Sequence, residues 1–173
     1  MTAHTGRLLL VPGSLDPADR TTRLLAATTT LVSPFAEVRW ADLGALPAYD
    51  TATPATPAVE AFLADLAWAD ALLLGSPEFH GAIGGRMKSA LDWAATAPER
   101  PLATRPVALV LDGEPHRSPA PYRLLLRTIE ATLIEPVLYT PDEDGFADSL
   151  LVDAASRRLL TLVLERLAAA ATR

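Results

Sequence analysis

The sequence predicts an α/β protein in which a doubly wound parallel sheet of five strands carries helices on both faces. Short apolar runs that suit buried strands alternate with longer segments in which apolar residues recur at helical spacing. Alternation of this kind is typical of parallel strands joined by helical crossovers. With 173 residues, half of them hydrophobic, the chain has the size and composition of a single domain covering residues 1–173.

The first half of the chain supplies two strands and two helices. The run 7–12 (RLLLVP) is apolar and is followed by Gly, which suits a central strand, while 21–32 shows helical spacing. A short second strand is expected over 37–40. After a connection rich in Pro and Thr, the segment 59–68 is expected to form the second helix.

The middle of the chain supplies two further strands with a helix between them. The run 69–75 (ADALLLG) is apolar enough for a strand that is buried on both faces. A helix is expected over 83–95, and the fourth strand over 105–111 (RPVALVL). Gly84 and Gly85 lie in the first turn of this helix, where their lack of a side chain indicates close packing.

The last part of the chain supplies two helices and the fifth strand. The helices are expected over 122–133 and 154–170, with a short strand over 135–139 between them. Pro136 in that strand indicates an edge position, because proline has no N–H to give to a neighbouring strand. The acidic segment 142–145 lacks the terminal Glu of a calcium loop, so we interpret it as a solvated turn.

Composition excludes several classes of function. The net charge of −6 gives no basic stripe for a nucleic-acid backbone, so we expect no nucleic-acid partner. The chain has no cysteine, and its three histidines share no metal-ligand spacing, so no metal site is expected. No apolar run is long enough to cross a membrane, and the amino terminus lacks signal-peptide flanks. A cytoplasmic location is therefore expected.

One segment carries most of the functional information. Between 75 and 93 the chain reads GSPEFHGAIGGRMKSALDW, a loop of small residues that leads from the third strand into the third helix. It resembles the second cofactor loop of the NAD(P)H-dependent FMN reductase family, a flavodoxin-like group that includes quinone, azo-dye and chromate reductases. Phe79 stands in place of the usual Tyr, and Ser89 in place of the usual Asn. The positions that match the family pattern are Ser76, Pro77, Glu78, His80, Gly81, Lys88, Ala90, Leu91, Asp92 and Trp93.

The resemblance implies a flavodoxin-like strand order of 2-1-3-4-5, with the switch point between strands one and three. Ligands of open α/β sheets bind outside the carboxyl ends of the strands at such a point. The loops near Gly13 and Ser76 are then expected to face each other across one crevice.

The second loop is expected, by resemblance, to hold the FMN ring. Its members Pro77, Glu78, Phe79, His80 and Gly81 would offer backbone N–H groups to the ring edge, and Gly81 would let the backbone approach closely. His80 is expected to contact cofactor or substrate. A lone loop histidine is otherwise more often an ordinary surface residue, and that alternative stays open here.

The first loop follows the family pattern less well. Ser14, Arg20 and Thr21 are the residues expected to hold the FMN phosphate, at the positive end of the first helix. Asp16 stands where the family has an Arg, and Asp19 where it has a Ser or Gly. We expect Asp16 to be an outward-facing turn residue and Asp19 to be the N-cap of the helix.

The third loop, after the fourth strand, keeps a single glycine of the family pattern. By resemblance Gly113 is expected to bind the cofactor. His116 and Arg117 could bind a substrate carboxylate or the nicotinamide phosphate, with a solvated loop as the alternative.

The family implies an oxidoreductase with FMN and NAD(P)H as cofactors and no catalytic side chain, because the flavin carries the chemistry. The acceptor would be a quinone, azo compound, other small aromatic molecule, free flavin or pathway-specific substrate. The helix over 83–95 would form a homodimer or homotetramer, and an exposed Trp93 would suit such an interface. The alternative is a divergent flavodoxin-like protein with weak or lost FMN binding, acting as a binding module or a cofactor-independent enzyme. A one-electron carrier ranks last.

Overall fold

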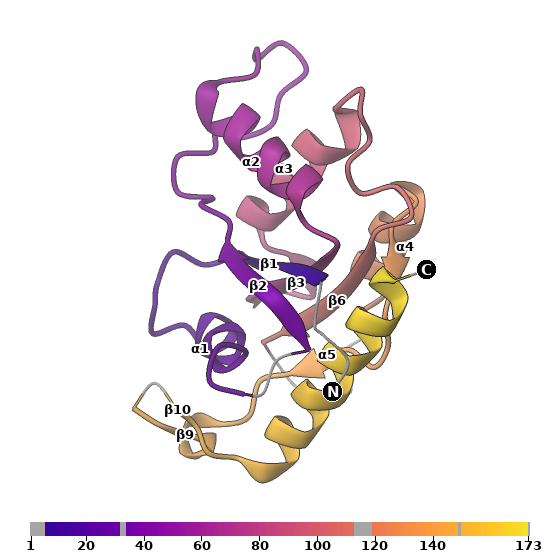
Figure 1. The fold of residues 1–173 in the computed structure, drawn as a ribbon. Coiled ribbons are helices and arrows are strands. Elements are labelled where there is room, and N and C mark those ends of the chain that lie inside the picture. The colour runs from indigo at the N-terminus through magenta and orange to yellow at the C-terminus, as the bar shows by residue number, and fades with distance from the viewer. Residues whose placement is uncertain (1–5, 32–33, 113–118, 149, 173) are drawn as a thin grey trace.

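A computed structural model describes residues 6–31, 34–112, 119–148 and 150–172. Its centre is a parallel sheet in the order β2-β1-β3-β6-β7, with β8 also paired to β6 (Figure 1). The six strands are β1 (Gly6–Pro12), β2 (Phe35–Trp40), β3 (Ala71–Ser76), β6 (Pro106–Leu111), β7 (Thr132–Leu133) and β8 (Leu138–Tyr139).

This order confirms the expected flavodoxin-like arrangement, because β7 and β8 together fill the fifth position. The first four expected strands agree with the structure to within two residues at each end. The fifth strand was expected to be continuous over 135–139 and is instead two short pieces. Pro136 lies between the pieces and has no N–H for β6, while the Val137 N–H bonds the Glu135 side chain. Its edge position is confirmed.

The described helices cover both faces of the sheet (Figure 1). One face carries α1 (Arg20–Ala27) and α5 (Ala154–Ala171), and the other carries α2 (Pro57–Trp68), α3 (Gly85–Thr96) and α4 (Ala120–Thr128). Strand residues alternate between the two cores. Leu8 and Leu10 of β1 lie in the core beneath α1 and α5, whereas Leu9 and Val11 lie in the core beneath α2, α3 and α4. Both faces of the expected sheet are therefore covered.

Helix α1 is shorter than the expected 21–32. It ends at Ala27, where the chain enters a run of threonines. The Thr29 and Thr30 hydroxyls donate to the carbonyls of Ala26 and Ala27. Side chains of this type compete with the helix for its own carbonyls, which favours an end at this point.

Helices α3 and α4 also differ from their expected bounds. Ile83 belongs to a short strand, so α3 begins only at Gly85, with Gly84 as its N-cap. Helix α4 ends at Thr128 because Glu130 adopts a left-handed backbone with φ 61°. The apolar residues that suggested a helix up to 133 still pack against the core, but from the turn after α4 and from β7. They are Ile129 and Leu133.

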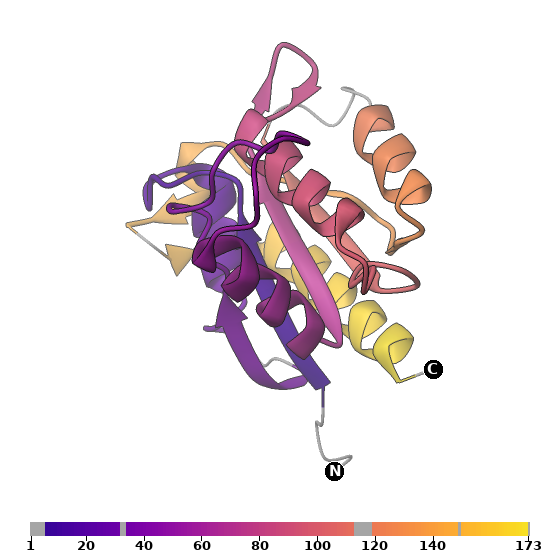
Figure 2. The same cartoon turned by 90° about the horizontal axis from the view of Figure 1, so that it is seen from above.

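Two small hairpins and a 3-10 turn complete the structure. The first hairpin joins β4 (Glu78–Phe79) to β5 (Ala82–Ile83) and projects beyond the end of the sheet (Figure 2). The second joins β9 (Phe146–Ala147) to β10 (Leu150–Leu151) next to α1, after the 3-10 turn η1 (Glu143–Gly145). Among the described helices, none has the length and apolar character needed to cross a bilayer.

Candidate functional site

The carboxyl ends of β1, β3 and β6 meet at one edge of the sheet. The Gly13 N–H donates to the Gly75 carbonyl at 2.6 Å, and the Asp112 N–H donates to the Ser76 carbonyl at 3.3 Å. A Cβ on Gly13 would lie 2.9 Å from the Gly75 oxygen, so the first two loops approach backbone to backbone. Gly13 and Ser76 therefore meet at the switch point, as expected.

The second loop is a β-hairpin rather than an irregular loop. His80 (φ 55°) and Gly81 (φ 77°) form its two-residue turn, and both have the left-handed backbone that a tight hairpin requires. Phe79 is 59% exposed, and His80 and Gly81 are also exposed. Glu78 is half-buried in the same hairpin and Pro77 is buried at its base. The structure thus brings these five predicted residues together in one hairpin after the carboxyl end of β3.

The base of this hairpin is tightly packed. The buried Ser76 hydroxyl donates to the Pro77 carbonyl at 3.1 Å. A Cβ on Gly84 would lie 3.3 Å from the same carbonyl, so the expected close packing at Gly84 is confirmed. The same expectation for Gly85 is wrong, because a Cβ there would meet nothing within 4 Å.

Tyr122 of α4 lies beneath the hairpin and was not predicted as a site residue. Its hydroxyl is buried and makes no hydrogen bond of ordinary geometry to a described residue. Burial raises the pKa of Tyr122 to about 12; the nearby Ser76 hydroxyl opposes this rise and the charge of Glu78 adds to it. The sequence offered a weak signal for this residue. A tyrosine near a loop combines an apolar ring with a polar hydroxyl, and such residues are common where a core meets a binding surface.

The first loop is a tight turn closed by its own side chains. The half-buried Ser14 accepts the Asp16 N–H through its hydroxyl at 3.2 Å. Asp16 accepts the Ala18 N–H at 2.8 Å and is exposed. The expectation that Asp16 is an outward-facing turn residue is confirmed.

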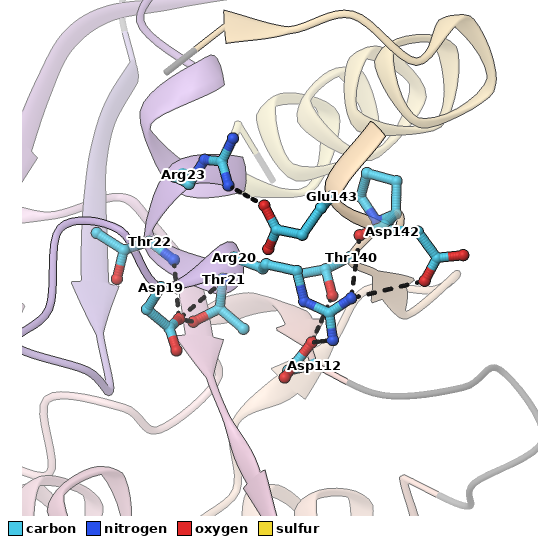
Figure 3. Close-up of polar contacts among 10 residues, drawn as sticks. Asp19, Arg20, Thr21, Thr22, Arg23, Asp112, Thr140, Asp142 and Glu143 are labelled. Atoms are coloured by element: carbon cyan, nitrogen blue, oxygen red, sulfur yellow. Dashed lines mark hydrogen bonds and ion pairs between the residues drawn. The ribbon is translucent and has the colours of Figure 1, made fainter. Parts of the chain in front are cut away.

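Asp19 is the N-cap of α1, also as expected. Its Oδ1 accepts the N–H groups of Thr21 at 2.9 Å and Thr22 at 3.3 Å (Figure 3). The hydroxyl of Thr21, which is fully buried, donates to the same oxygen. Three donors at the positive end of the helix therefore converge on one carboxylate oxygen.

Arg20 was predicted as a phosphate ligand, and in the structure it is paired with acids. It contacts Asp112 at the end of β6 at 2.6 Å and Asp142 at 3.7 Å. The Thr140 hydroxyl, directly after β8, donates to the Asp112 carboxylate at 2.7 Å. Neither Asp112 nor Thr140 was predicted, although both follow strands at the carboxyl edge, and that position was the available signal.

Arg23 joins α1 to the acidic segment. Its guanidinium contacts Glu143 at 2.7 Å, donates to the Asp148 carbonyl at 2.6 Å and lies 4.1 Å from the ring centre of Phe146. The prediction of a solvated turn over 142–145 is therefore wrong in part: Asp142 and Glu143 are exposed, but both are paired with arginines of α1.

A segment of the same chain covers one face of α3. Trp93 is only 7% exposed, because its indole N–H donates to the Pro47 carbonyl and its ring packs edge-on against Tyr49. Arg86 donates to the Leu43 carbonyl. The expectation of an exposed Trp93 is therefore wrong.

Three predicted residues, Gly113, His116 and Arg117, lie outside the described residues. Within the described part of the chain, no group of three His, Asp or Glu side chains could hold a metal ion.

The sheet order and the helical crossovers define a flavodoxin-like fold. Solved structures show the same fold at low sequence identity. The flavoenzyme NAD(P)H:(acceptor) oxidoreductase FerB of Paracoccus denitrificans superposes with a TM-score of 0.83 at 17% identity, covering 97% of this chain and 98% of FerB. An archaeal flavodoxin has a TM-score of 0.58 at 16% identity, over 93% of this chain and 98% of its own.

Residues 7–133 match the model of the NADPH-dependent FMN reductase family, and the chain belongs to this family. An NAD(P)H-dependent FMN reductase of Pseudomonas aeruginosa is 34% identical over 107 residues, which are 60% of this chain and 58% of the relative. An NADPH:quinone oxidoreductase of Arabidopsis thaliana is 32% identical over 114 residues, 62% of this chain and 58% of the relative. The matches thus span somewhat more than half the length of these relatives.

The residues at the switch point suit one end of FMN and not the other. Around Gly81 a Cβ would meet nothing within 4 Å, so a flat ring has room against the hairpin backbone. At the start of α1, Asp19 already receives the donors that a phosphate would need. The ring end fits, whereas the phosphate end is filled by the chain's own carboxylate.

Proposed function

We propose that this chain is an FMN-dependent NAD(P)H oxidoreductase that reduces a small aromatic, quinone or flavin acceptor. Its membership of the NADPH-dependent FMN reductase family supports this proposal, as does the crevice where flavodoxin-like folds take ligands. A bound flavin supplies the redox chemistry in such an enzyme, while the protein binds, orients and excludes water. We therefore expect no side chain to be indispensable as an acid or base.

The observation that carries the proposal is the exposed hairpin of β4 and β5 beside the crevice. Phe79 leaves its aromatic ring 59% exposed, so the ring is free to stack on a flat ligand. The open space around Gly81 gives a flat ring access to the hairpin backbone. We infer that the Pro77–Gly81 turn holds the ring, with His80 in contact with cofactor or substrate.

The direct test is NADH and NADPH oxidation by the purified chain with FMN present, using a quinone, an azo dye and free flavin as acceptors. Turnover that requires both flavin and protein is the expected result. A protein that neither binds flavin nor consumes NADH or NADPH with any of these acceptors would overturn the proposal.

The hairpin itself is tested by Phe79→Ala, with Leu124→Ala as the matched control. The two side chains have similar exposed fractions, 59% and 61%, so neither variant should disturb the core. Loss of one stacked aromatic ring is expected to weaken flavin binding by about tenfold, which corresponds to about 1.4 kcal/mol. Leu124 lines a separate groove between α4 and β7, and its variant should bind flavin normally.

We propose assembly as a homodimer or homotetramer through the part of α3 that the chain itself leaves uncovered. Gly85, Lys88 and Ala95 are exposed there, and Lys88 forms an ion pair with Asp92 one turn away at 2.6 Å. Light scattering should report an oligomer, and Ala95→Arg should shift it to the monomer. A monomeric mass at every concentration would count against this interface.

We also infer that residues 1–173 act as one domain in the cytoplasm. Two apolar cores on opposite faces of one sheet support a single unit, which should unfold in one transition by circular dichroism. A cytoplasmic location is consistent with the supply of NAD(P)H there and is testable by cell fractionation.

A further inference from the structure

The start of α1 is where the structure departs most from a phosphate site. In a helix N-terminus that binds an anion, the free N–H groups of the first turn point at the ligand. Here the N–H groups of Thr21 and Thr22 and the Thr21 hydroxyl all donate to Asp19 (Figure 3). The carboxylate acts as an internal anion in the position that an external one would take.

The two nearby cations are also committed to acids. Arg20 contacts Asp112 and Asp142 and donates to the Pro141 carbonyl at 3.4 Å. Arg23 contacts Glu143. Arg20 and Arg23 thus lie among four carboxylates of the described residues, so the local charge at this end of α1 is negative. The four are Asp19, Asp112, Asp142 and Glu143.

A negative environment discriminates between two forms of the same ring. The terminal phosphate of FMN would lie beside the Asp19 carboxylate, which already accepts the N–H and hydroxyl donors at the start of the helix. The phosphate and the carboxylate carry like charges and repel each other. Riboflavin ends in a neutral hydroxyl, which can donate a hydrogen bond to a carboxylate oxygen. The ring and most of the ribityl chain are the same in both, so any difference in affinity reports the phosphate end.

Resting on the proposed function, we propose that the crevice recognises flavin by its ring and ribityl chain and binds riboflavin at least as tightly as FMN, with Asp19 as the residue that sets this preference. The phosphate then contributes no favourable free energy. A flavin held in this way exchanges readily, as a diffusible substrate or loosely bound cofactor does.

The test is titration of the full chain with riboflavin and with FMN, followed by quenching of flavin fluorescence. Asp19→Asn removes the charge and keeps a good N-cap, and Asp19→Ser is a second variant of the same kind. Asp16→Asn is the matched control, because it removes an exposed carboxylate of the same loop that faces away from the helix donors.

For the wild type we expect the Kd for FMN to equal or exceed that for riboflavin. Asp19→Asn and Asp19→Ser should lower the Kd for FMN by about tenfold and change that for riboflavin by less than about threefold. The control should change neither by more than about threefold. Added salt should strengthen the binding of FMN alone, since screening weakens repulsion.

Three outcomes would overturn the inference. If FMN binds the wild type more tightly than riboflavin, the inference fails and the proposed function stands. If both variants fold, as judged by circular dichroism, and the ratio of the two Kd values does not change, Asp19 does not set the preference. If neither flavin binds the wild type or the variants, the proposed function fails and the inference fails with it.

Discussion

Asp19 and Arg20 are neighbours in the sequence, yet only one of them had a predictable role. Asp19 stands just before a segment with helical spacing, and local chemistry is enough to identify an N-cap. The partners of Arg20 lie far along the chain: Asp112 directly follows β6, and Asp142 lies in the segment after β8. Contacts of that kind depend on which strands become neighbours, so residue types and spacing do not reveal them. Tyr122 is similar, because its burial depends on where α4 packs.

Replacing Asp19 with Ala should destabilise the fold through α1. Three donors at the start of the helix would lose their acceptor, and the expected cost is about 1 kcal/mol of unfolding free energy. Urea denaturation of Asp19→Ala beside Asp19→Asn measures it, since Asn retains the cap. Equal stability of the two variants would show that the cap contributes little.

Tyr122 should make the protein less stable in strong alkali. Its folded pKa is about 12 and its ordinary pKa is 10.0, so the folded state holds the proton where the unfolded state has released it. The stabilisation is complete below pH 10 and is lost between about pH 10 and 12, by roughly 3 kcal/mol in total. Tyr122→Phe should be near neutral at pH 7, because the hydroxyl has no described hydrogen-bond partner.

Denaturation of wild type and Tyr122→Phe at neutral and alkaline pH checks this expectation. As the pH rises, the unfolding free energy of the wild type should fall further than that of Tyr122→Phe. Parallel losses in both proteins would mean that Tyr122 does not titrate in the folded state as its burial requires.

Among the elements, the strands were easier to predict than the helix ends. β1, β3 and β6 are buried apolar runs, and such runs leave few alternatives. The ends of α1 and α4 are set by threonine hydroxyls and by the left-handed turn at Glu130, which hydrophobic spacing does not register. The hairpin of β4 and β5 was missed because it contains only two residues in each strand.

Gly13, directly after β1, and Gly85, at the start of α3, should respond in opposite ways to Ala. In Gly13→Ala the new Cβ would lie 2.9 Å from the Gly75 oxygen and 3.2 Å from the Ser76 Cα, and backbone atoms cannot rotate away. We expect a loss of about 1–3 kcal/mol in unfolding free energy. Gly85→Ala meets nothing within 4 Å and should gain up to about 1 kcal/mol. Urea denaturation of both variants provides the comparison.

The same experiment contains its own control, because both changes add one methyl group to a glycine. A destabilised Gly85→Ala, or an unchanged Gly13→Ala, would contradict the packing described for these loops.

Over the whole molecule, polar interactions gather at both ends of the sheet, and the apolar cores lie between them. The carboxyl end carries the crevice, and the opposite end carries an ion pair in which Arg7 of β1 and Asp70 before β3 make two side-chain hydrogen bonds, at 3.1 and 2.9 Å. Apolar patterning was sufficient to predict the cores, and the strand order was supported by resemblance. At the polar ends, the N-cap at Asp19 was predicted, whereas the ion pairs of Arg7 and Arg20 were not.

The Arg7–Asp70 pair should contribute to stability against acid. The hydrogen bonds from Arg7 lower the pKa of the Asp70 carboxyl below its usual 3.8. A lowered folded pKa means that this stabilisation is complete above about pH 4 and is lost as the pH falls through the folded value. Asp70→Asn should be less stable than wild type at neutral pH and should lose less stability on acidification. Thermal melting from neutral to acidic pH measures both effects, and identical acid profiles would contradict the assignment.

Both borders of the sheet are unsuited to pairing with another molecule's strand. On one side β2 carries Glu37 and Arg39, and the Arg39 guanidinium lies over Trp68 at 3.9 Å. On the other side β7 and β8 are two residues each, with Pro136 between them. Charged and interrupted borders discourage the edge-to-edge growth that leads proteins to aggregate. Association of this protein should therefore proceed through its helical faces, and concentrated solutions should not form extended β-structure.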